Sequence, residues 1–404
     1  MMEPKIRLKG FCGEWKDCLY GDHIISVQTG TNLLGDVWNK GIPLLKMGNI
    51  QRGYFDFEKL EYLNEDVCPN DSSIAKYGDF FYNTRNTLEL VGKGATWMHK
   101  SGLYAFNSNI AKCVFSGIDT FFFNYLYNTN GIIKQVQARA KGTTSVAAVY
   151  LSDLKSIQLS LPTYDEQRAL ATFFTSLDNQ ISAAEKRLAS LKQVKAASLQ
   201  AMFPQEGETT PKLRFKGWEG EWKKVKLGEM YEPRNEKNDL SFGVNDIISV
   251  ANMYFRPISY VSNDDYLKSY NIFRVGDIAF EGHKSKNFSH GRFVENSIGD
   301  GIVSHVFVVL KRKDKQFDVD FWKYYINNER IMCGILTRST KSSTMMNDIV
   351  VSDFLKESIL VPSYEEQVKI GNYFTALDRQ LTAQSSKISK LKQIKSACLD
   401  QMFV

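Results

Sequence analysis

Two carboxylates and a lysine in the second half of the chain are of the types that a metal-dependent nuclease uses. Asp277, Glu281 and Lys284 lie within eight positions of one another, and a metal-dependent nuclease needs clustered carboxylates of this kind beside a lysine. The corresponding stretch of the first half has only one carboxylate, in the series Asp79, Asn83 and Arg85. The sequence therefore favours a strand-end Gly-Asp turn in both halves, and a self-contained nuclease stays open as the weaker hypothesis.

Other catalytic motifs are missing from the sequence. None of the nine prolines is followed by a second proline, so there is no NPPY-like loop with which an amino-methyltransferase could hold its target base. There is no GxxxxGK[ST] loop, and the glycines at 92 and 94 lack the third glycine of a dinucleotide loop. No Ser/His/Asp or Cys/His arrangement stands out. We therefore expect a non-catalytic binding or organising subunit that itself holds no cofactor and no metal.

Basic residues are mixed with aromatic and amide side chains in the predicted loops of each half. Lys and Arg neutralise phosphates, and Arg, Asn and Gln read base edges in the major groove. The predicted DNA contacts of the first half are Lys46, Arg52, Arg85, Lys93, Arg139, Lys141, Thr143 and Thr144. Those of the second half are Arg256, Lys284, Lys286, Arg292, Arg338, Lys341 and Ser343. Any one of them could instead belong to a solvated face, so the prediction rests on their arrangement and not on a single residue. The loops at 141–145 and 341–344 are the strongest candidates for DNA contact.

The elements that must position these loops are repeated in the chain. Leu161–Phe203 and Val361–Phe403 align without a gap, and 18 of their 43 positions are identical. No proline or glycine lies between Tyr164 and Phe203, so the first copy is predicted to form one helix. About 38 residues at 1.5 Å each give a rod of roughly 57 Å.

Apolar residues recur in both rods at spacings of three and four, which is typical of the narrow seam of a coiled coil. An isolated amphipathic rod is unstable, so each rod needs a partner, and the other copy is the obvious one. The predicted spacer and partner-contacting residues are Phe174, Leu177, Ile181, Leu188, Leu191, Phe374, Leu377, Leu381, Ile388 and Leu391.

Each rod also begins with the same helix-start signal. Pro162 precedes Thr163, and a glutamate follows three residues later at 166; Pro362, Ser363 and Glu366 repeat the pattern. This is the pattern of a capping box, in which the hydroxyl and the carboxylate each accept a hydrogen bond from a backbone N–H.

The repeat extends beyond the rods. Pro4–Trp15 reads PKIRLKGFCGEW and Pro211–Trp222 reads PKLRFKGWEGEW, while the middles of the two halves share little. Helices are predicted at Thr120–Asn128 and Asp320–Asn328, and a final strand is predicted to carry Asp153 or Asp353. Further strands are predicted at Ile42–Ile50, Leu103–Phe106, Ile110–Phe115, Ile247–Val250 and Ile302–Leu310, with turn-strand units at Gly78–Tyr82 and Gly276–Phe280.

Length and composition fit this organisation. A chain of 404 residues suggests two or three domains, and a net charge of +6 permits a polyanionic partner without proving one. The six cysteines show no CxxC pair, which argues against a disulfide framework or structural zinc and fits a reducing cytoplasm. There is no apolar signal core and no membrane-length apolar run, so we expect a cytoplasmic protein without a membrane role.

The repeated phrases resemble those of the specificity subunits of type I restriction–modification enzymes, the HsdS family. The resemblance is carried by the openers at Pro4–Trp15 and Pro211–Trp222, and by Leu161–Ile181 and Val361–Leu381 with their Pro-x-x-x-Glu-Gln run followed by Leu-Asp. It covers essentially the whole chain.

The resemblance implies an α+β fold with two pseudo-repeated mixed α/β target-recognition domains separated by two long antiparallel coiled-coil helices. The expected divisions are recognition domains at residues 1–160 and 204–360 and spacer helices at 161–203 and 361–404. Each domain would read one half of an interrupted, asymmetric double-stranded DNA target, and the helices would set the gap.

The resemblance also implies partners. Two methyltransferase subunits and the motor-nuclease subunits would dock on the repeated scaffold, and S-adenosylmethionine, ATP and Mg would be bound by those partner subunits. The alternative from another class is a tandem coiled-coil scaffold that binds proteins and has no role on DNA.

Overall fold

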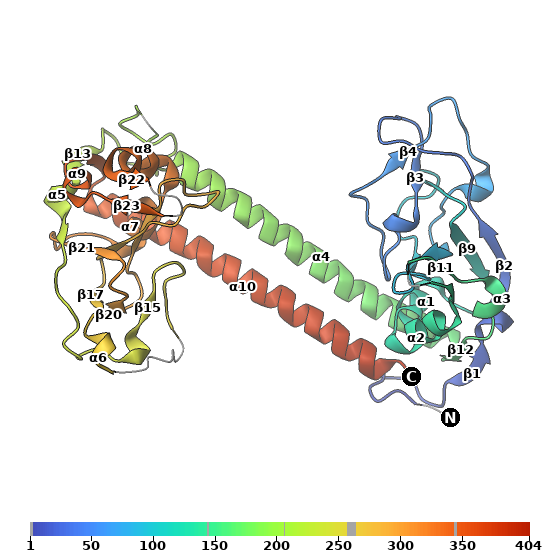
Figure 1. The fold of residues 1–404 in the computed structure, drawn as a ribbon. Coiled ribbons are helices and arrows are strands. Elements are labelled where there is room, and N and C mark those ends of the chain that lie inside the picture. Colours follow the sequence, from blue (N-terminus) through green and yellow to red (C-terminus); the bar gives the residue numbers. More distant parts are fainter. Residues whose placement is uncertain (1–2, 144, 206, 257–263, 343–345) are drawn as a thin grey trace. The chain divides into compact units, whose positions relative to one another are not determined.

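The computed structural model describes residues 3–143, 145–205, 207–256, 264–342 and 346–404, and it divides the chain into two compact units. The first unit combines Met1–Ala184 with Lys387–Val404, and the second is Glu185–Ser386. Both chain termini therefore belong to the first unit (Figure 1). This grouping cuts across the linear division expected from the sequence, because each unit takes one end of each long helix.

The two repeated rods are single long helices. α4 runs from Tyr164 to Ala201 and α10 from Tyr364 to Met402, close to the predicted bounds. In the first unit the start of α4 packs antiparallel against the end of α10, and Lys395 forms an ion pair with Asp178. In the second unit the end of α4 packs against the start of α10, and Lys195 forms an ion pair with Asp378.

The end of each helix also completes the core of the other half's domain. Phe403 packs against Phe174, with ring centroids 5.6 Å apart, and Phe203 packs against Phe374 at 5.7 Å. The repeated opening segments, Pro4–Trp15 and Pro211–Trp222, also bind these helix ends. The Ile6 N–H donates to Gln401 O at 3.0 Å, and the Leu213 N–H donates to Ala201 O at 2.8 Å. Each unit is thus closed by residues from both halves of the sequence.

The seam residues are buried or half-buried, as the helical pattern predicts. Phe174 and Phe374 are fully buried in the main core of their unit, and Leu177 and Leu377 lie in the same cores. The remaining predicted seam residues are buried, at Ile181 and Ile388, or half-buried, at Leu188, Leu191, Leu381 and Leu391.

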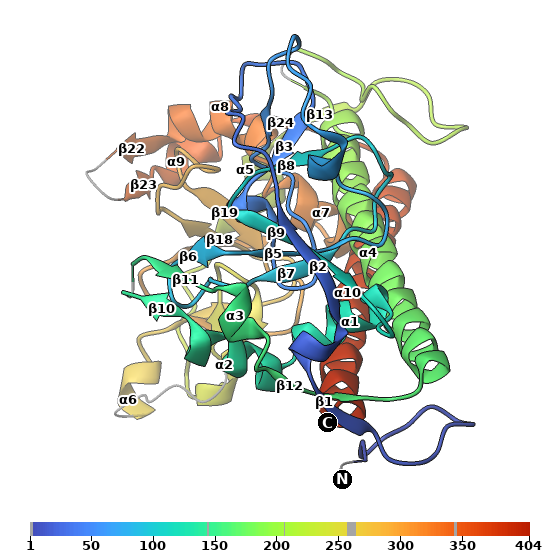
Figure 2. The ribbon, with the colours of Figure 1, turned by 90° about the vertical axis from the view of Figure 1, so that its right-hand side faces the viewer.

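The first unit is built on a four-stranded antiparallel sheet. Its strand order is β2-β9-β5-β7, with bounds Ile24–Thr29, Ile110–Phe115, Phe80–Asn83 and Gly94–Thr96. Figure 2 shows this sheet with the smaller strands around it. These are the pair β1 (Lys16–Leu19) and β12 (Gln158–Leu161), the sheet β4 (Glu61–Tyr62), β3 (Pro43–Leu45) and β8 (Ala105–Phe106), and the sheet β10 (Lys141–Gly142), β11 (Ala147–Ala148) and β6 (Arg85–Asn86). Its helices before α4 are α1 (Thr120–Tyr127), α2 (Asn130–Arg139) and α3 (Leu151–Leu154).

The second unit repeats this topology. Its four-stranded sheet has the order β14-β21-β18-β19, with bounds Tyr231–Pro233, Val308–Arg312, Ile278–Glu281 and Arg292–Glu295. The smaller pairs are β13 (Lys223–Lys226) with β24 (Ser358–Val361), β15 (Ile248–Ser249) with β16 (Tyr254–Phe255), β17 (Asn271–Phe273) with β20 (Gly301–Val303), and β22 (Thr340–Ser342) with β23 (Asn347–Ile349). Its helices before α10 are α5 (Leu227–Met230), α6 (Asp264–Leu267), α7 (Val319–Tyr325), α8 (Glu329–Ser339) and α9 (Val351–Phe354).

Several expected elements differ in detail. The strand predicted at Ile42–Ile50 is only β3, because the Asn49 side chain accepts the Lys46 N–H at 2.8 Å and closes a 3-10 turn. The strand predicted at Ile302–Leu310 is two strands, β20 and β21, which are joined by a turn. Asp153 and Asp353 lie in the short helices α3 and α9, and the final strand follows each helix.

The capping box at the start of each rod is only half formed. The Thr163 hydroxyl accepts the Glu166 N–H at 3.4 Å, and Ser363 accepts that of Glu366 at 3.3 Å, as predicted. The Glu166 carboxylate, however, accepts two hydrogen bonds from the Arg7 guanidinium, at 2.8 and 2.7 Å. A bidentate, charge-assisted pair is stronger than a bond to a neutral N–H, so the opener arginine displaces the predicted reciprocal contact.

Candidate nucleic-acid interface

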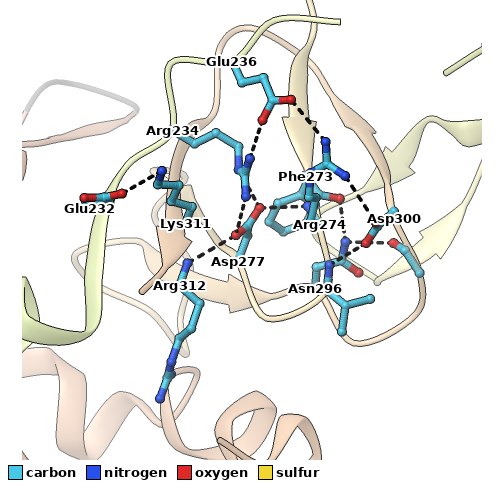
Figure 3. A network of polar contacts seen from close by, with 12 residues as sticks. Glu232, Arg234, Glu236, Phe273, Arg274, Asp277, Asn296, Asp300, Lys311 and Arg312 are labelled. Atoms are coloured by element: carbon cyan, nitrogen blue, oxygen red, sulfur yellow. Dashed lines mark hydrogen bonds and ion pairs between the residues drawn. The ribbon is translucent and has the colours of Figure 1, made fainter. Parts of the chain in front are cut away.

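The carboxylate of Asp277 has a structural role. It accepts the Arg274 N–H at 2.8 Å, its other oxygen accepts the Arg312 N–H at 3.3 Å, and Arg234 forms an ion pair with it at 2.7 Å (Figure 3). Burial raises the pKa of Asp277, and the Arg234 contact opposes that shift. The side chain is 2% exposed, so it closes the strand-end Gly-Asp turn that the sequence favoured.

The other carboxylate of the nuclease hypothesis is also occupied. Glu281 forms an ion pair with Arg292 at 2.7 Å. Within the described ranges, no group of three His, Cys, Asp or Glu side chains could hold a metal ion. The first unit makes the same turn with Asp79, which accepts the Lys76 N–H at 2.9 Å. Two matching turns, one per unit, are what a repeated structural feature requires.

The described residues on either side of each predicted polar loop form an antiparallel strand pair, the two hairpins β10–β11 and β22–β23. In the first unit β10 pairs with β11, and β11 also pairs with β6, so that Ala148 lies opposite both Lys141 and Arg85. In the second unit Lys341 lies opposite Asp348 in β22–β23, and a bridge joins His283 to Met346. Each hairpin therefore lies beside the segment that follows the central strand, β5 or β18.

Two further candidates meet close to the end of β5. Lys93 donates its ammonium hydrogen bond to Gln51 Oε1 at 2.6 Å, and the neighbouring Arg52 donates to Glu89 O at 3.0 Å. The two cations are close enough that Arg52 lowers the pKa of Lys93, although burial is the larger cause. The strand end of β5 thus gathers Arg52, Lys93 and Arg85 beside the Lys141 hairpin.

The remaining candidates are more scattered. Lys46 pairs with Glu61 and lines a separate polar hollow of about 790 Å³. Arg139 binds Ser156 O at 2.8 Å, and Arg338 pairs with Glu357 at 2.7 Å, so both tie a helix end to a nearby turn. Exposed surface positions are occupied by Thr143, Arg256, Lys284 and Lys286, while Thr144 and Ser343 lie outside the described residues.

Sequence reasoning missed the residues that support this region. Asn83 is fully buried, accepts the Lys93 N–H at 3.1 Å and donates to Leu90 O at 3.2 Å. α2 and α8, which carry Arg139 and Arg338, were not predicted either. The sequence had already set Asn83 against Glu281, but it gave no sign that Asn83 is buried and hydrogen-bonded to the Lys93 backbone.

Comparison with known proteins identifies the architecture. The family model for the type I restriction modification DNA specificity domain matches the chain twice, at residues 23–193 and 219–393. The chain belongs to this family. Membership makes it a DNA-specificity subunit that works with other subunits of a restriction–modification system, and the prediction of family and fold class is confirmed.

Individual relatives agree with the family match. The chain is 23% identical over 391 residues to the putative type I restriction enzyme MjaX specificity subunit of Methanocaldococcus jannaschii, covering 89% of this chain and 86% of that protein. The S subunit structure from M. genitalium matches 100% of this chain and 99% of its own, with a TM-score of 0.60 and 14% identity. A chain from a type I complex matches 96% of this chain and 97% of its own, with a TM-score of 0.50 and 16% identity. The two structures show a common fold.

No helix in the described part of the chain combines the length and the apolar character that a bilayer-spanning segment needs.

Proposed function

We propose that each unit reads one half of an interrupted DNA target through the hairpin and loops at the end of its central strand. The observation that carries this proposal is a repeated framework with unlike loops. The two sheets share one strand order, and each is tied to a long helix by the same buried ion pair, Arg7 with Glu166 and Arg214 with Glu366. Because the loops on this common framework differ, the two half-sites should differ and the target should be asymmetric.

The chain is proposed to carry no catalytic group of its own. The carboxylates of the nuclease hypothesis are engaged by Arg234 and Arg292. Two methyltransferase subunits and the motor-nuclease subunits would supply the chemistry, with S-adenosylmethionine, ATP and Mg bound by them. Residues exposed on the repeated helices would receive these partners, because the repeat gives each methyltransferase subunit an equivalent surface.

The long helices are proposed to set the unread gap of the target. Inserting four residues into one of them adds roughly 6 Å along its axis. At about 3.4 Å per base pair, the gap should lengthen by one or two pairs. Retained activity with an unchanged gap would show that the helices are not the ruler.

The test of the whole proposal is a genome-wide map of methylated adenines in the host, with the chain present and with its gene deleted. An interrupted, asymmetric methylated motif should disappear on deletion. If the map does not change while the methyltransferase partner is expressed and co-purifies with the chain, the chain does not direct methylation.

The protein-binding scaffold is distinguished by direct binding measurements. A DNA reader must lose affinity steeply as salt rises, because phosphate contacts release counterions. A scaffold without a DNA role would show neither the affinity nor the slope. A self-contained nuclease would be identified by cleavage of supercoiled DNA by the purified chain with magnesium or manganese.

A further inference from the structure

The end of the central strand, β5 in the first unit and β18 in the second, carries a different charge in the two units. The strand register shows which positions correspond between the units. Tyr82 lies opposite Gly94 in β5–β7, and Phe280 lies opposite Phe293 in β18–β19. One residue further along, Asn83 and Lys93 in the first unit correspond to Glu281 and Arg292 in the second.

The loop beside this place also corresponds between the units. Ile50–Phe55 reads IQRGYF and Val250–Phe255 reads VANMYF, and both turn through a left-handed residue, Gly53 with φ 85° and Met253 with φ 48°. Arg52 in the first unit therefore corresponds to Asn252 in the second.

In the second unit the cation is neutralised within the protein. Arg292 pairs with Glu281 at 2.7 Å, donates to Ala251 O at 2.8 Å and lies over the Phe288 ring at 4.9 Å. These contacts use the charge and much of the donor capacity of its guanidinium. The place is close to electrically neutral and internally satisfied.

In the first unit neither cation forms an ion pair in the described part of the chain; burial lowers the pKa of both, and the Glu89 carboxylate, acting through space, offsets this only in part. The hydrogen bonds of Arg52 and Lys93 go to neutral oxygens, Glu89 O and Gln51 Oε1. Asn83 stands where the second unit has its glutamate, and both cations are half-buried. Two partly desolvated like charges destabilise each other, and an anion bound directly between them would relieve what Glu89 offsets only in part.

We propose that Arg52 and Lys93 form a phosphate-binding position for the DNA backbone that the second unit lacks. This inference rests on the proposed function. A phosphate would replace the missing carboxylate, and it fits a point charge and a planar guanidinium side by side. The position fixes the first unit on the duplex without reading sequence, so the two units contribute unequally to the salt-dependent part of binding.

The test is equilibrium binding of the full chain, with its partner subunits, to fluorescent duplexes over a range of salt concentrations. One duplex carries the target and a second has an unrelated sequence. The double substitution R52Q/K93Q removes one phosphate contact and should lower the slope of log affinity against log salt by about 0.9. At about 0.15 M salt that corresponds to roughly fivefold weaker binding, by the same factor on both duplexes.

The second unit supplies the matched controls. E281Q/R292Q removes a neutral pair and should leave the slope unchanged, whereas E281N/N252R places two cations without a glutamate at the corresponding position and should raise the slope by about one. K93R keeps the charge and should keep the slope. If R52Q/K93Q fails to fold, the comparison of K93R with K93Q and the gain-of-charge variant decide the question.

Two results would overturn the proposal. A slope that does not change in R52Q/K93Q would show that these cations do not meet phosphate. A loss confined to the target duplex would show that they read bases instead. Failure of the proposed function looks different, because the unsubstituted chain and its complex would then show no salt-dependent DNA binding at all.

Discussion

Two regions of each unit differ in how strictly they repeat. One is the base of the unit, where a long helix begins and contacts the opener and the domain helix α1 or α7; the other is the set of loops at the end of the central strand. At the base, Gln167 Oε1 accepts the Asp119 N–H at 2.9 Å and Gln367 Oε1 accepts the Asp318 N–H at 3.3 Å. The same two aspartates cap α1 and α7 by accepting the N–H three residues on, at 2.9 and 2.7 Å. At the strand ends, by contrast, Asn83 is replaced by Glu281 and Arg52 by Asn252.

This difference shows which parts of the fold are constrained. The base contacts are buried and couple an opener, a helix start and a domain helix, so changing one partner leaves an unpaired polar group. At the strand ends each unit satisfies its own side chains within itself, Asn83 through the backbone of Lys93 and Leu90 and Glu281 through Arg292, so the residues can differ between the units. A repeated base with variable loops is what two readers of different sequences on one frame require.

The largest expected effect comes from breaking the repeated ion pair at the base. We expect E166A and E366A each to lower the free energy of unfolding by about 3–5 kcal/mol, since each leaves a largely buried arginine without its partner. Side-chain exposures are nearly the same in the two pairs, 17% and 1% against 16% and 2%. Denaturant unfolding should therefore give similar losses, and a loss in only one unit would mean that the two bases are not equivalent. Replacing both partners of a pair by methionine should restore most of the stability.

A second comparison concerns the aromatic residues that close each unit. Phe203 is fully buried against Phe374, while Phe403 is 9% exposed. We expect F203A to cost about 3 kcal/mol and F403A less, because the less completely buried ring removes less apolar surface from water and leaves a smaller cavity. Thermal melting of the two variants measures this order. Equal losses would show that the two rings contribute equally to their cores.

A third comparison uses a buried acid found in the second unit. Glu295 is 1% exposed and its carboxylate oxygens have no hydrogen-bond partner among the described residues, so burial raises its pKa well above the usual range. The folded state therefore keeps a proton that the unfolded chain loses above about pH 4.3, and stability should fall as pH rises above that value. E295Q removes this loss, so it should stabilise the protein at pH 7 by on the order of 1 kcal/mol and have less effect near pH 4. The measurement is urea unfolding at both pH values.

The first unit provides the control for this acid. Thr96 occupies the corresponding position by strand register and donates its hydroxyl to Thr120 O at 2.6 Å. T96V should cost about 1 kcal/mol at every pH, because the lost hydrogen bond does not titrate. If E295Q is equally pH-independent, Glu295 does not carry the proton assigned to it.

The smallest expected effects are those of the hairpin lysines. K141A and K341A should each weaken binding to all DNA sequences alike and lower the salt slope by about one if the lysine meets a phosphate. Lys141 pairs with Asp153 at 2.9 Å, whereas Lys341 has no ion-pair partner in the part of the chain that is described, so K341A should have the larger effect. Titration of target and unrelated duplexes with K141A and with K341A measures both affinity and salt slope. If neither variant changes the salt slope, the hairpins are not part of the interface.

The sequence by itself determined the repeat, the long helices and the family. Periodic apolar residues at Phe174 and Leu177, an N-cap before each rod and the absence of breakers specify a helix from local information alone. The Gly-Asp turns were likewise predicted correctly, because a glycine followed by an aspartate at a strand start is a local signal. The loops at 141–145 and 341–344 remain predicted DNA contacts.

Only the tertiary structure decided which residues meet. Arg7 takes the carboxylate of Glu166 away from its capping box across 159 positions of sequence, and Phe403 closes a core that begins at Trp15. Asp277 and Glu281 resemble a metal site in the sequence, yet Asp277 is held by Arg234, 43 positions away, and Glu281 by Arg292 on the neighbouring strand. Local propensity fixes an element, but the partner of a buried charge is set by packing between elements, and that information is not contained in any one segment.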